Sequence, residues 1–161
     1  MPGEAERIVV NTGPLIALGR IDAFDLIGHM PLAFMIPKEV SDEIEIGARA
    51  GYAVAVPTWA TILPLKDAIA PLGPHLLDRG EAAVIQLAIE EGVSDVCIDE
   101  WRGRRAAAAI GLKVTGSLGL LGRAKTLGLT SAVSPWVQKL KASGIHYHPE
   151  LLRNFLLSMG E

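Results

Sequence analysis

The chain has 161 residues, of which half are hydrophobic and 20% are charged, and its formal net charge is −3. This composition excludes an extended disordered chain, and the charge gives no overall signature of a protein that binds nucleic acid. Any contact with RNA or DNA must therefore come from a local basic cluster. The length suits one domain with a sizeable core. We expect a single domain over residues 1–161, with a core at about 7–143 and a C-terminal amphipathic helix at about 149–159.

The sequence also argues against a membrane protein. Its longest uncharged stretch, residues 50–65, is short for a membrane-spanning helix and contains two prolines. Residues 1–7 lack the basic segment that leads into the apolar part of a secretion signal. The one cysteine, Cys97, lies in an apolar run, which indicates a small core residue in a reducing compartment. We therefore expect a cytoplasmic protein.

In the first half of the chain, short apolar runs that predict strands alternate with longer helical patterns. In order, these are a strand at 8–10, a helical pattern from Leu15 to Phe24, a strand at 33–36, a helix from Pro37 to about Ala48, and a loop with a short edge strand at 53–65. Pro14 suits the first turn of its helix, where no backbone N–H is needed. Pro57 and Pro64 favour an edge position for the last strand.

The second half continues this alternation. Its predicted elements are a helix at 81–91, a strand at 93–98, a helix at 101–110, a strand at 113–115, and helices at 117–127, 134–142 and 150–159. Gly92 is the expected end of the first of these helices, because glycine readily adopts the left-handed conformation that terminates a helix. Strands that alternate with helices predict an α/β fold, in which helices cover both faces of a central parallel sheet to give three α/β/α layers.

Asp99 is the most informative single residue, because it follows the predicted strand at 93–98. The carboxyl ends of parallel strands meet at one edge of the sheet, where such folds bind ligands. An acid at this place suits metal or phosphate chemistry. The alternative is that Asp99 caps the helix that begins near Trp101, which is a common position for aspartate. Taken alone, the two interpretations have similar weight.

Three further positions offer oxygen groups, and each has a structural alternative. Glu81 lies three residues after Asp78, which resembles a capping box at the start of a helix. Glu43 belongs to a helix with several acids, which usually form a solvated face, although its neighbours allow it to border the buried stripe. Asn11, or Thr12 after it, can cap the helix that follows the first strand.

Four short motifs occur along the chain in an order that is specific, although each motif alone is a weak signal of any protein family. They are Val9–Leu18, Leu77–Ile85, Ile98–Glu100 and Gly111–Gly119. Together they resemble the PIN-domain superfamily, and more specifically its prokaryotic PIN-like toxin-type nuclease branch, formerly a family of unknown function. The resemblance covers roughly residues 8–142. It implies a ribonuclease that depends on Mg²⁺ or Mn²⁺ and has a cluster of acids at the edge of the sheet.

Matched position by position, the resemblance places the metal ligands on four residues: Asn11, Glu43, Glu81 and Asp99. The three acids among them are the expected catalytic residues. Such a cluster suits cleavage of a phosphodiester, since Mg²⁺ and Mn²⁺ prefer oxygen ligands and neutralise charge on phosphoryl oxygens. Asn11 stands where an acid is expected. It offers a neutral carbonyl oxygen but no charge, so we expect weaker metal affinity.

Substrate contacts are expected from nearby arginines and hydroxyl groups. The cluster of Arg102, Arg104 and Arg105 supplies the candidate contacts to RNA phosphates. The three cannot all share one helix face, but Arg102 and Arg105 can, because they lie three residues apart. The alternative is a solvated helix surface that balances the acids. Ser117 matches a hydroxyl position near the site in the PIN resemblance, and Thr12 is the other candidate.

Two further features have structural interpretations. The tripeptide His146-Tyr147-His148 has metal-ligand residue types, but with no cysteine or further histidine nearby we interpret it as a loop. The apolar stripe of the helix at 150–159 predicts docking onto the domain, with a dimer or partner surface as the alternative.

These observations support three hypotheses. The first is a divalent-metal-dependent endoribonuclease of PIN type, the toxin component of a toxin–antitoxin pair, with RNA as substrate, a cognate antitoxin protein as partner and a homodimer as assembly. The second, motivated by Asn11, is a catalytically inactive PIN-fold module that binds RNA or protein. The third is a phosphoacceptor receiver domain, which needs an acidic pair after the first strand, where this chain has Asn11 and Thr12.

Overall fold

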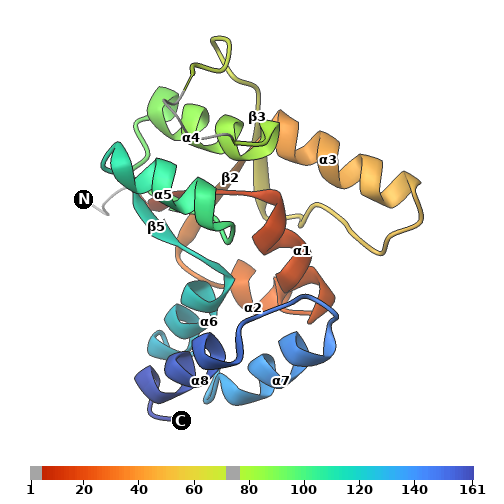
Figure 1. Ribbon diagram of the computed structural model, residues 1–161, viewed down its shortest axis with the longest axis vertical. Coiled ribbons are helices and arrows are strands. Elements are labelled where there is room, and N and C mark those ends of the chain that lie inside the picture. Colours follow the sequence, from red (N-terminus) through yellow and green to blue (C-terminus); the bar gives the residue numbers. More distant parts are fainter. Residues whose placement is uncertain (1–4, 72–76) are drawn as a thin grey trace.

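The computed structural model describes residues 5–71 and 77–161 (Figure 1). Within these residues five strands and eight helices follow one another. The strands are β1 (Glu6–Val10), β2 (Leu32–Pro37), β3 (Ala60–Leu63), β4 (Asp95–Cys97) and β5 (Lys113–Thr115). The helices are α1 (Thr12–Arg20), α2 (Phe24–Gly28), α3 (Lys38–Arg49), α4 (Arg79–Glu91), α5 (Trp101–Ala109), α6 (Ser117–Thr126), α7 (Ser134–Ala142) and α8 (Pro149–Ser158).

The five strands form one parallel sheet in the order β3-β2-β1-β4-β5. In the central strand β1, Ile8, Val9 and Val10 are all buried, as expected of a parallel strand that is covered on both faces. The predicted α/β fold with a central parallel sheet is confirmed. Receiver domains have the flavodoxin-like order 2-1-3-4-5, so the receiver hypothesis is wrong.

The order of the strands also fixes where a ligand site is favoured. The chain runs from β1 to β2 and β3 on one side of the sheet, and then returns to β4 and β5 on the other side. The winding therefore reverses between β1 and β4, which pair through Ile8 with Asp95 and through Val10 with Cys97. Open α/β sheets bind ligands outside the carboxyl ends of the strands at such a switch point. The residues that follow Val10 and Cys97 occupy that position.

Helices cover both faces of the sheet and give the three α/β/α layers. Helix α4 packs across β1, β2 and β4, with α5 next to it on β5, and it also contacts α3 (Figure 1). Helix α6 packs against α1 and α2. Fully buried side chains come from several of these elements: Leu18 of α1, Ile36 of β2, Ile85 of α4 and Leu121 of α6. The core therefore extends across the sheet.

The predicted helical pattern from Leu15 to Phe24 is wrong in one respect, because it contains two helices. Helix α1 ends at Arg20, and Asp22 has a positive φ of 55° that interrupts the helical backbone. Aspartate tolerates this left-handed conformation better than most residues, because its side chain is short and polar. Ala23 is buried at the start of α2. Core residues lie on both sides of the break, so the apolar period continues across it.

Other predicted boundaries are confirmed. The carboxylate of Asp78 accepts a hydrogen bond from the backbone N–H of Glu81 at 2.8 Å, which caps the start of α4. Gly92 ends that helix with a φ of 65°. Strand β3 lies at the edge of the sheet, as its flanking prolines predict. Cys97 is fully buried in β4, and burial raises the pKa of its thiol.

The C-terminal helix docks onto the domain, as its apolar stripe predicts. Leu152 of α8 is 2% exposed, whereas Leu157 on the outer side is 66% exposed. Phe155 and Met159 both lie 3.2 Å from the position that a β-carbon on Gly122 of α6 would occupy. The close approach of α8 to α6 therefore depends on that glycine. Neither α8 nor any other helix in the described ranges is long and apolar enough to cross a membrane.

Candidate functional site

The four residues expected to form a metal site come from four different elements. Asn11 follows β1, and Asp99 lies two residues after β4. Glu43 belongs to α3, and Glu81 belongs to the first turn of α4. All four elements reach the edge of the sheet at the switch point between β1 and β4.

A chain of contacts connects the end of β1 to α3 and α4. Thr12 donates a hydrogen bond from its Oγ1 to Oε2 of Glu43 at 2.5 Å. The same Oε2 lies 3.0 Å from the position that a β-carbon on Gly80 would occupy. Gly80 directly precedes Glu81 in α4. A side chain at Gly80 would therefore displace the Glu43 carboxylate from the start of α4.

The chain of contacts then returns through α5 and β4 to its starting point. The Glu81 carboxylate lies against Gly103 of α5, and Ile98 lies 2.9 Å from the β-carbon position of the same glycine. Asp99 follows Ile98, and its Cβ is 3.9 Å from the β-carbon position of Gly13, at the start of α1. The contacts form a closed ring, so the structure brings all four predicted positions around one edge of the sheet.

Asn11 occupies the N-cap position of α1, but neither its side chain nor that of Thr12 caps the helix. Asn11 is 5% exposed, and its backbone N–H donates to the carbonyl oxygen of Cys97 at 3.0 Å. Its side chain makes no capping hydrogen bond, and its Oδ1 is buried without a hydrogen-bond partner. The hydroxyl of Thr12 is directed to Glu43. The capping alternative is therefore confirmed for the position of Asn11 but not for its side chain, and its amide oxygen, which has no partner among the described residues, is available to a ligand.

Glu81 has the most unusual environment of the acids. Its side chain is 5% exposed, and its Oε2 is buried without a hydrogen-bond partner. Burial, followed by the nearby Asp78 carboxylate, raises the pKa of Glu81 to about 7. The capping interaction of Asp78 involves only the backbone N–H of Glu81. The helix cap and a functional role of the Glu81 side chain are therefore compatible.

Asp99 is held by the start of α6 and does not cap α5. Its Oδ1 accepts a hydrogen bond from the backbone N–H of Ser117, and its Oδ2 accepts one from the Ser117 hydroxyl, both at 2.8 Å. Glu100 occupies the N-cap position of α5 instead. Burial raises the pKa of Asp99, although the hydrogen bonds from Ser117 oppose this shift. Ser117 therefore lies at the site, as the resemblance implies, and it orients Asp99.

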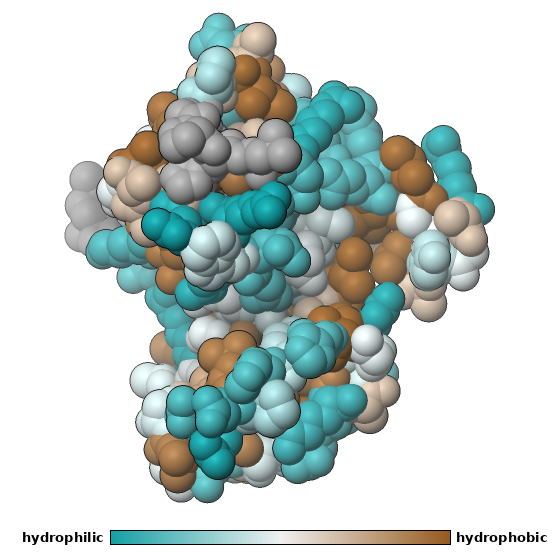
Figure 2. All heavy atoms as spheres, in the orientation of Figure 1, coloured by the Kyte–Doolittle hydropathy of each residue, from teal (hydrophilic) through white to brown (hydrophobic). Residues whose placement is uncertain are grey.

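The two arginines selected from the sequence have different surroundings. Arg102 lines an open hollow together with Glu81 and Glu100. Arg105 lies over the ring of Trp101, with its Cζ 4.8 Å from the ring centroid. Hydrophilic side chains gather over the region of α5 in Figure 2. Arg102 therefore borders the same hollow as Glu81, whereas Arg105 packs on Trp101, and a substrate contact of either arginine stays a prediction.

Arg104 is a site residue that the helix-face argument missed. Its Nη1 donates a hydrogen bond to the carbonyl oxygen of Ile98 at 2.9 Å, and the residue lines a cavity together with Asp99 and Glu100. Arg104 projects to this side of α5 because Ile98, at the end of β4, offers an acceptor. No local pattern in the sequence marks that carbonyl group.

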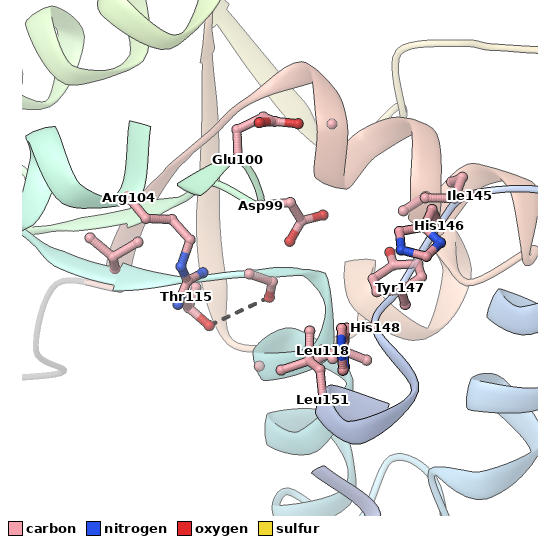
Figure 3. A pocket seen from close by; sticks show the side chains of 15 residues that line it. Asp99, Glu100, Arg104, Thr115, Leu118, Ile145, His146, Tyr147, His148 and Leu151 are labelled. Carbon is pink, nitrogen blue, oxygen red and sulfur yellow. Dashed lines mark hydrogen bonds between the residues drawn. The ribbon is translucent and has the colours of Figure 1, made fainter. Parts of the chain in front are cut away.

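Tyr147 is the second residue that sequence reasoning missed. Its hydroxyl lies 3.2 Å from Oγ of Ser117, the same hydroxyl that contacts Asp99. In Figure 3 it lies with His146 across the cavity from Arg104, and Asp99 lies between them. The segment is a loop, as interpreted, but it belongs to the site. Tyr147 and Ser117 are separated by 30 positions in the sequence, so no local pattern marks this contact.

The groups at this edge are of the chemical type that binds a divalent metal ion. The groups are all oxygens, and two of them, Asn11 Oδ1 and Glu81 Oε2, are buried without partners. Glu43 is held by Thr12 and Asp99 by Ser117, and within the described residues no three His, Cys, Asp or Glu side chains lie close enough to hold one ion together. Few direct ligands together with retained water match the usual coordination of Mg²⁺.

Comparison with protein families gives one finding. A family model described as a PIN domain matches residues 7–161. Comparisons with curated proteins and with solved structures gave no match. The family match runs from within β1 to the end of the chain, and so includes every residue of the ring of contacts described above.

Proposed function

The chain belongs to the PIN-domain family, and on this premise we propose that it is a divalent-metal-dependent endoribonuclease. PIN domains are generally nucleases and typically use divalent metals. The observation that carries the proposal is the pair of buried, unpartnered oxygens, Asn11 Oδ1 and Glu81 Oε2, inside a ring of acids at the switch point. Buried polar atoms are nearly always hydrogen-bonded, so two such oxygens in one site indicate a ligand.

Asn11, Glu43, Glu81 and Asp99 are the residues that would hold Mg²⁺ or Mn²⁺, and a bound ion would neutralise charge on the oxygens of the scissile phosphate. The protein keeps two of these residues in fixed positions. Thr12 holds Glu43 through one hydrogen bond, and Ser117 holds Asp99 through two. Pre-oriented carboxylates require less rearrangement when a substrate arrives.

Glu81 is the residue best suited to accept a proton from the attacking water. Without metal, burial raises the pKa of Glu81 to about 7, and a bound cation would lower it, so the carboxylate would be ionised and able to accept a proton. Its Oε2 has no competing hydrogen bond from the residues that the structure describes. Loss of the carboxylate at this position should therefore affect the chemical step as well as metal binding.

Substrate RNA would lie along the side of the site formed by α5 and α6. Arg102 borders the Glu81 side, and Arg104 borders the Asp99 side, with Glu100 next to both hollows. The negatively charged backbone phosphates of RNA can form ion pairs with these two arginines. Thr12 and Ser117 add hydroxyl groups at the start of α1 and α6, and Arg105 is a further candidate contact on α5.

The decisive experiment measures metal binding and cleavage separately. We expect Mn²⁺ to raise the melting temperature of the wild type, because an ion that binds only the folded state stabilises it. Single-stranded RNA should then be cut only when the metal is present. Glu81→Gln and Asp99→Asn should lose at least about tenfold in cleavage rate, whereas Glu45→Gln on the exposed side of α3 should not. Cleavage that survives both site substitutions would contradict this assignment.

A second candidate function is supported by Asn11. A catalytically inactive PIN-fold module would bind RNA or a protein partner without cutting it, since the amide at this position carries no charge. The wild type and Asn11→Asp should be compared in Mn²⁺. Cleavage by both proteins supports the nuclease, whereas cleavage only by Asn11→Asp supports the binding module.

We also propose that the nuclease is the toxin component of a toxin–antitoxin pair, forms a homodimer and acts on RNA in the cytoplasm, with a cognate antitoxin protein as partner. Expression of the wild type in bacteria should then arrest growth, and expression of Glu81→Gln should not. Light scattering measures the assembly directly. Normal growth at equal expression of the two proteins would contradict the toxin assignment.

A further inference from the structure

A cavity of about 510 Å³ lies between the carboxyl edge of the sheet and the loop that joins α7 to α8 (Figure 3). Its volume falls within the range of about 300–1,000 Å³ that is typical of sites for small ligands. One end carries Asp99 and Arg104, and the opposite wall carries His146 and Tyr147. The cavity is therefore continuous with the candidate metal site but extends beyond it.

The charged end of the cavity matches a single phosphodiester group. The guanidinium of Arg104 has five N–H donors, of which Nη1 is anchored on the carbonyl oxygen of Ile98. Guanidinium groups bind phosphate oxygens through paired hydrogen bonds. Arg104 is the one cation in this lining, and Asp99 and Glu100 lie beside it. Among the described residues, this one positive group stands beside two acids, whose charge repels a dianionic phosphate more strongly than the singly charged phosphodiester of a nucleic-acid chain.

The opposite wall matches a flat, partly apolar group. His146 presents an exposed ring, and Leu118 and Leu151 add apolar surface below it (Figure 3). The Tyr147 hydroxyl is fixed by Ser117, which holds the loop in place. Unpaired RNA bases are commonly stacked on aromatic or histidine rings and on apolar side chains.

His148 adds a defined hydrogen-bond donor to the same wall. Its Nδ1 accepts a hydrogen bond from the backbone N–H of Glu150 at 3.2 Å. In the neutral ring the proton is therefore on Nε2, which is free to donate to the edge of a base. A donor beside a stacking surface can distinguish bases that offer an acceptor from those that offer a donor.

We propose that this cavity binds one nucleotide of a single-stranded RNA, with its phosphodiester on Arg104 and its base against His146 and Leu151. The inference rests on the proposed nuclease function and deepens it. Because Asp99 belongs to both the cavity and the acid cluster, the nucleotide bound here is a neighbour of the scissile phosphate. The enzyme therefore has a base preference at that one position.

The test measures RNA binding without divalent metal, so that no cleavage occurs. Fluorescence anisotropy gives the affinity of the full chain for labelled five-nucleotide strands of A, C or U. The variant His146→Ala/Leu151→Ala changes two exposed residues of the wall, so its fold should persist. His29→Ala/Leu157→Ala is the matched control, because both of its residues are exposed and lie outside the cavity.

We expect the wall variant to bind its best strand at least about fivefold more weakly and to lose the difference between A, C and U. Arg104→Gln should weaken all three strands to a similar degree, and the control should match the wild type. Unchanged affinity and preference in the wall variant would overturn the inference, as would a wild type that binds none of the strands. Tighter binding of 5′-mononucleotides than of the strands would overturn the assignment to an RNA chain.

Cleavage in Mn²⁺ distinguishes failure of this inference from failure of the nuclease proposal. A wild type that binds the strands through the wall residues but never cuts supports the nucleotide site and contradicts the nuclease. A wild type that cuts with a base preference that the wall variant retains supports the nuclease and overturns the nucleotide site.

Discussion

At the scale of single residues, Glu81 is an acid whose burial makes its ionised form unfavourable to the stability of the fold. Its carboxyl has an ordinary pKa of 4.5 when exposed, and burial followed by Asp78 raises this value to about 7 in the fold. Between these two pH values the folded chain binds more protons at Glu81 than the unfolded chain does. The free energy of unfolding therefore falls as the pH rises from about 4.5 through about 7 and Glu81 loses its proton in the folded state. A bound cation would offset this unfavourable buried charge.

We predict that Glu81→Gln stabilises the metal-free protein more at pH 8 than at pH 5. Glutamine keeps the shape of the side chain and removes the charge, so the difference between the two pH values should be roughly 2 kcal/mol. Urea unfolding at both pH values measures it. Glu45→Gln, an exposed acid of α3, should show no such difference. An equal effect of Glu81→Gln at pH 5 and pH 8 would mean that Glu81 titrates normally in the fold.

At the scale of secondary-structure elements, glycines set how closely the helices approach the acids. Gly80 of α4 lies against the Glu43 carboxylate, and Gly103 of α5 lies against the Glu81 carboxylate. The N-cap residue Gly116, before α6, has its β-carbon position 2.6 Å from Oδ1 of Asp99. In each case the missing side chain leaves the space that an acid of another element occupies. Helix propensity alone would favour alanine at the positions within helices.

We predict that Gly103→Ala destabilises the protein by about 1–3 kcal/mol, because the new methyl group meets Ile98 and the Glu81 carboxylate in a filled space. Gly47→Ala in α3 is the matched control. Its β-carbon would lie 3.3 Å from one side-chain atom of Val54, so the change should be neutral or stabilise by up to about 1 kcal/mol. Chemical unfolding compares the two variants. Equal stability would show that α5 shifts freely away from Glu81.

At the scale of the whole molecule, the last third of the chain adds residues to the site at the carboxyl edge of the sheet. Helix α6 supplies Ser117, which donates to Asp99, and the loop before α8 supplies Tyr147, whose hydroxyl contacts the Ser117 hydroxyl. Two interactions hold α8 and the C-terminus against the domain. Leu152 is buried, and the Glu161 carboxylate accepts hydrogen bonds from the backbone N–H groups of Val133 and Ser134 at the start of α7.

We predict that Leu152→Ala destabilises the protein by about 2–5 kcal/mol, as is usual for a buried leucine that leaves a cavity. Leu157→Ala on the exposed face of the same helix should change stability by less than about 0.5 kcal/mol. Thermal unfolding of the two variants measures the difference. RNA affinity should fall with Leu152→Ala, because His146 and Tyr147 lose their support. Equal stability and affinity in the two variants would contradict a structural role of α8 at the site.

Much of the fold follows from local sequence. The β-branched run Ile8–Val10 predicts a buried strand, and Asp78 and Gly92 mark the ends of α4, because strand pattern and helix caps depend on residues near one another in the chain. The break between α1 and α2 was not predictable in this way. It depends on the left-handed conformation of Asp22, which aspartate tolerates but does not require.

The sequence by itself determined the alternation of strands and helices, and its resemblance to PIN domains indicated which acids to examine. Only the tertiary structure decided what each of these residues does. It directs Thr12 to Glu43, pairs Asp99 with Ser117 and Ser117 with Tyr147, leaves an oxygen of Glu81 buried without a partner among the described residues, and brings Arg104 to the cavity. The reason is physical: hydrogen-bond partners, burial and pKa depend on groups that are distant in sequence and meet only when the helices pack around the sheet.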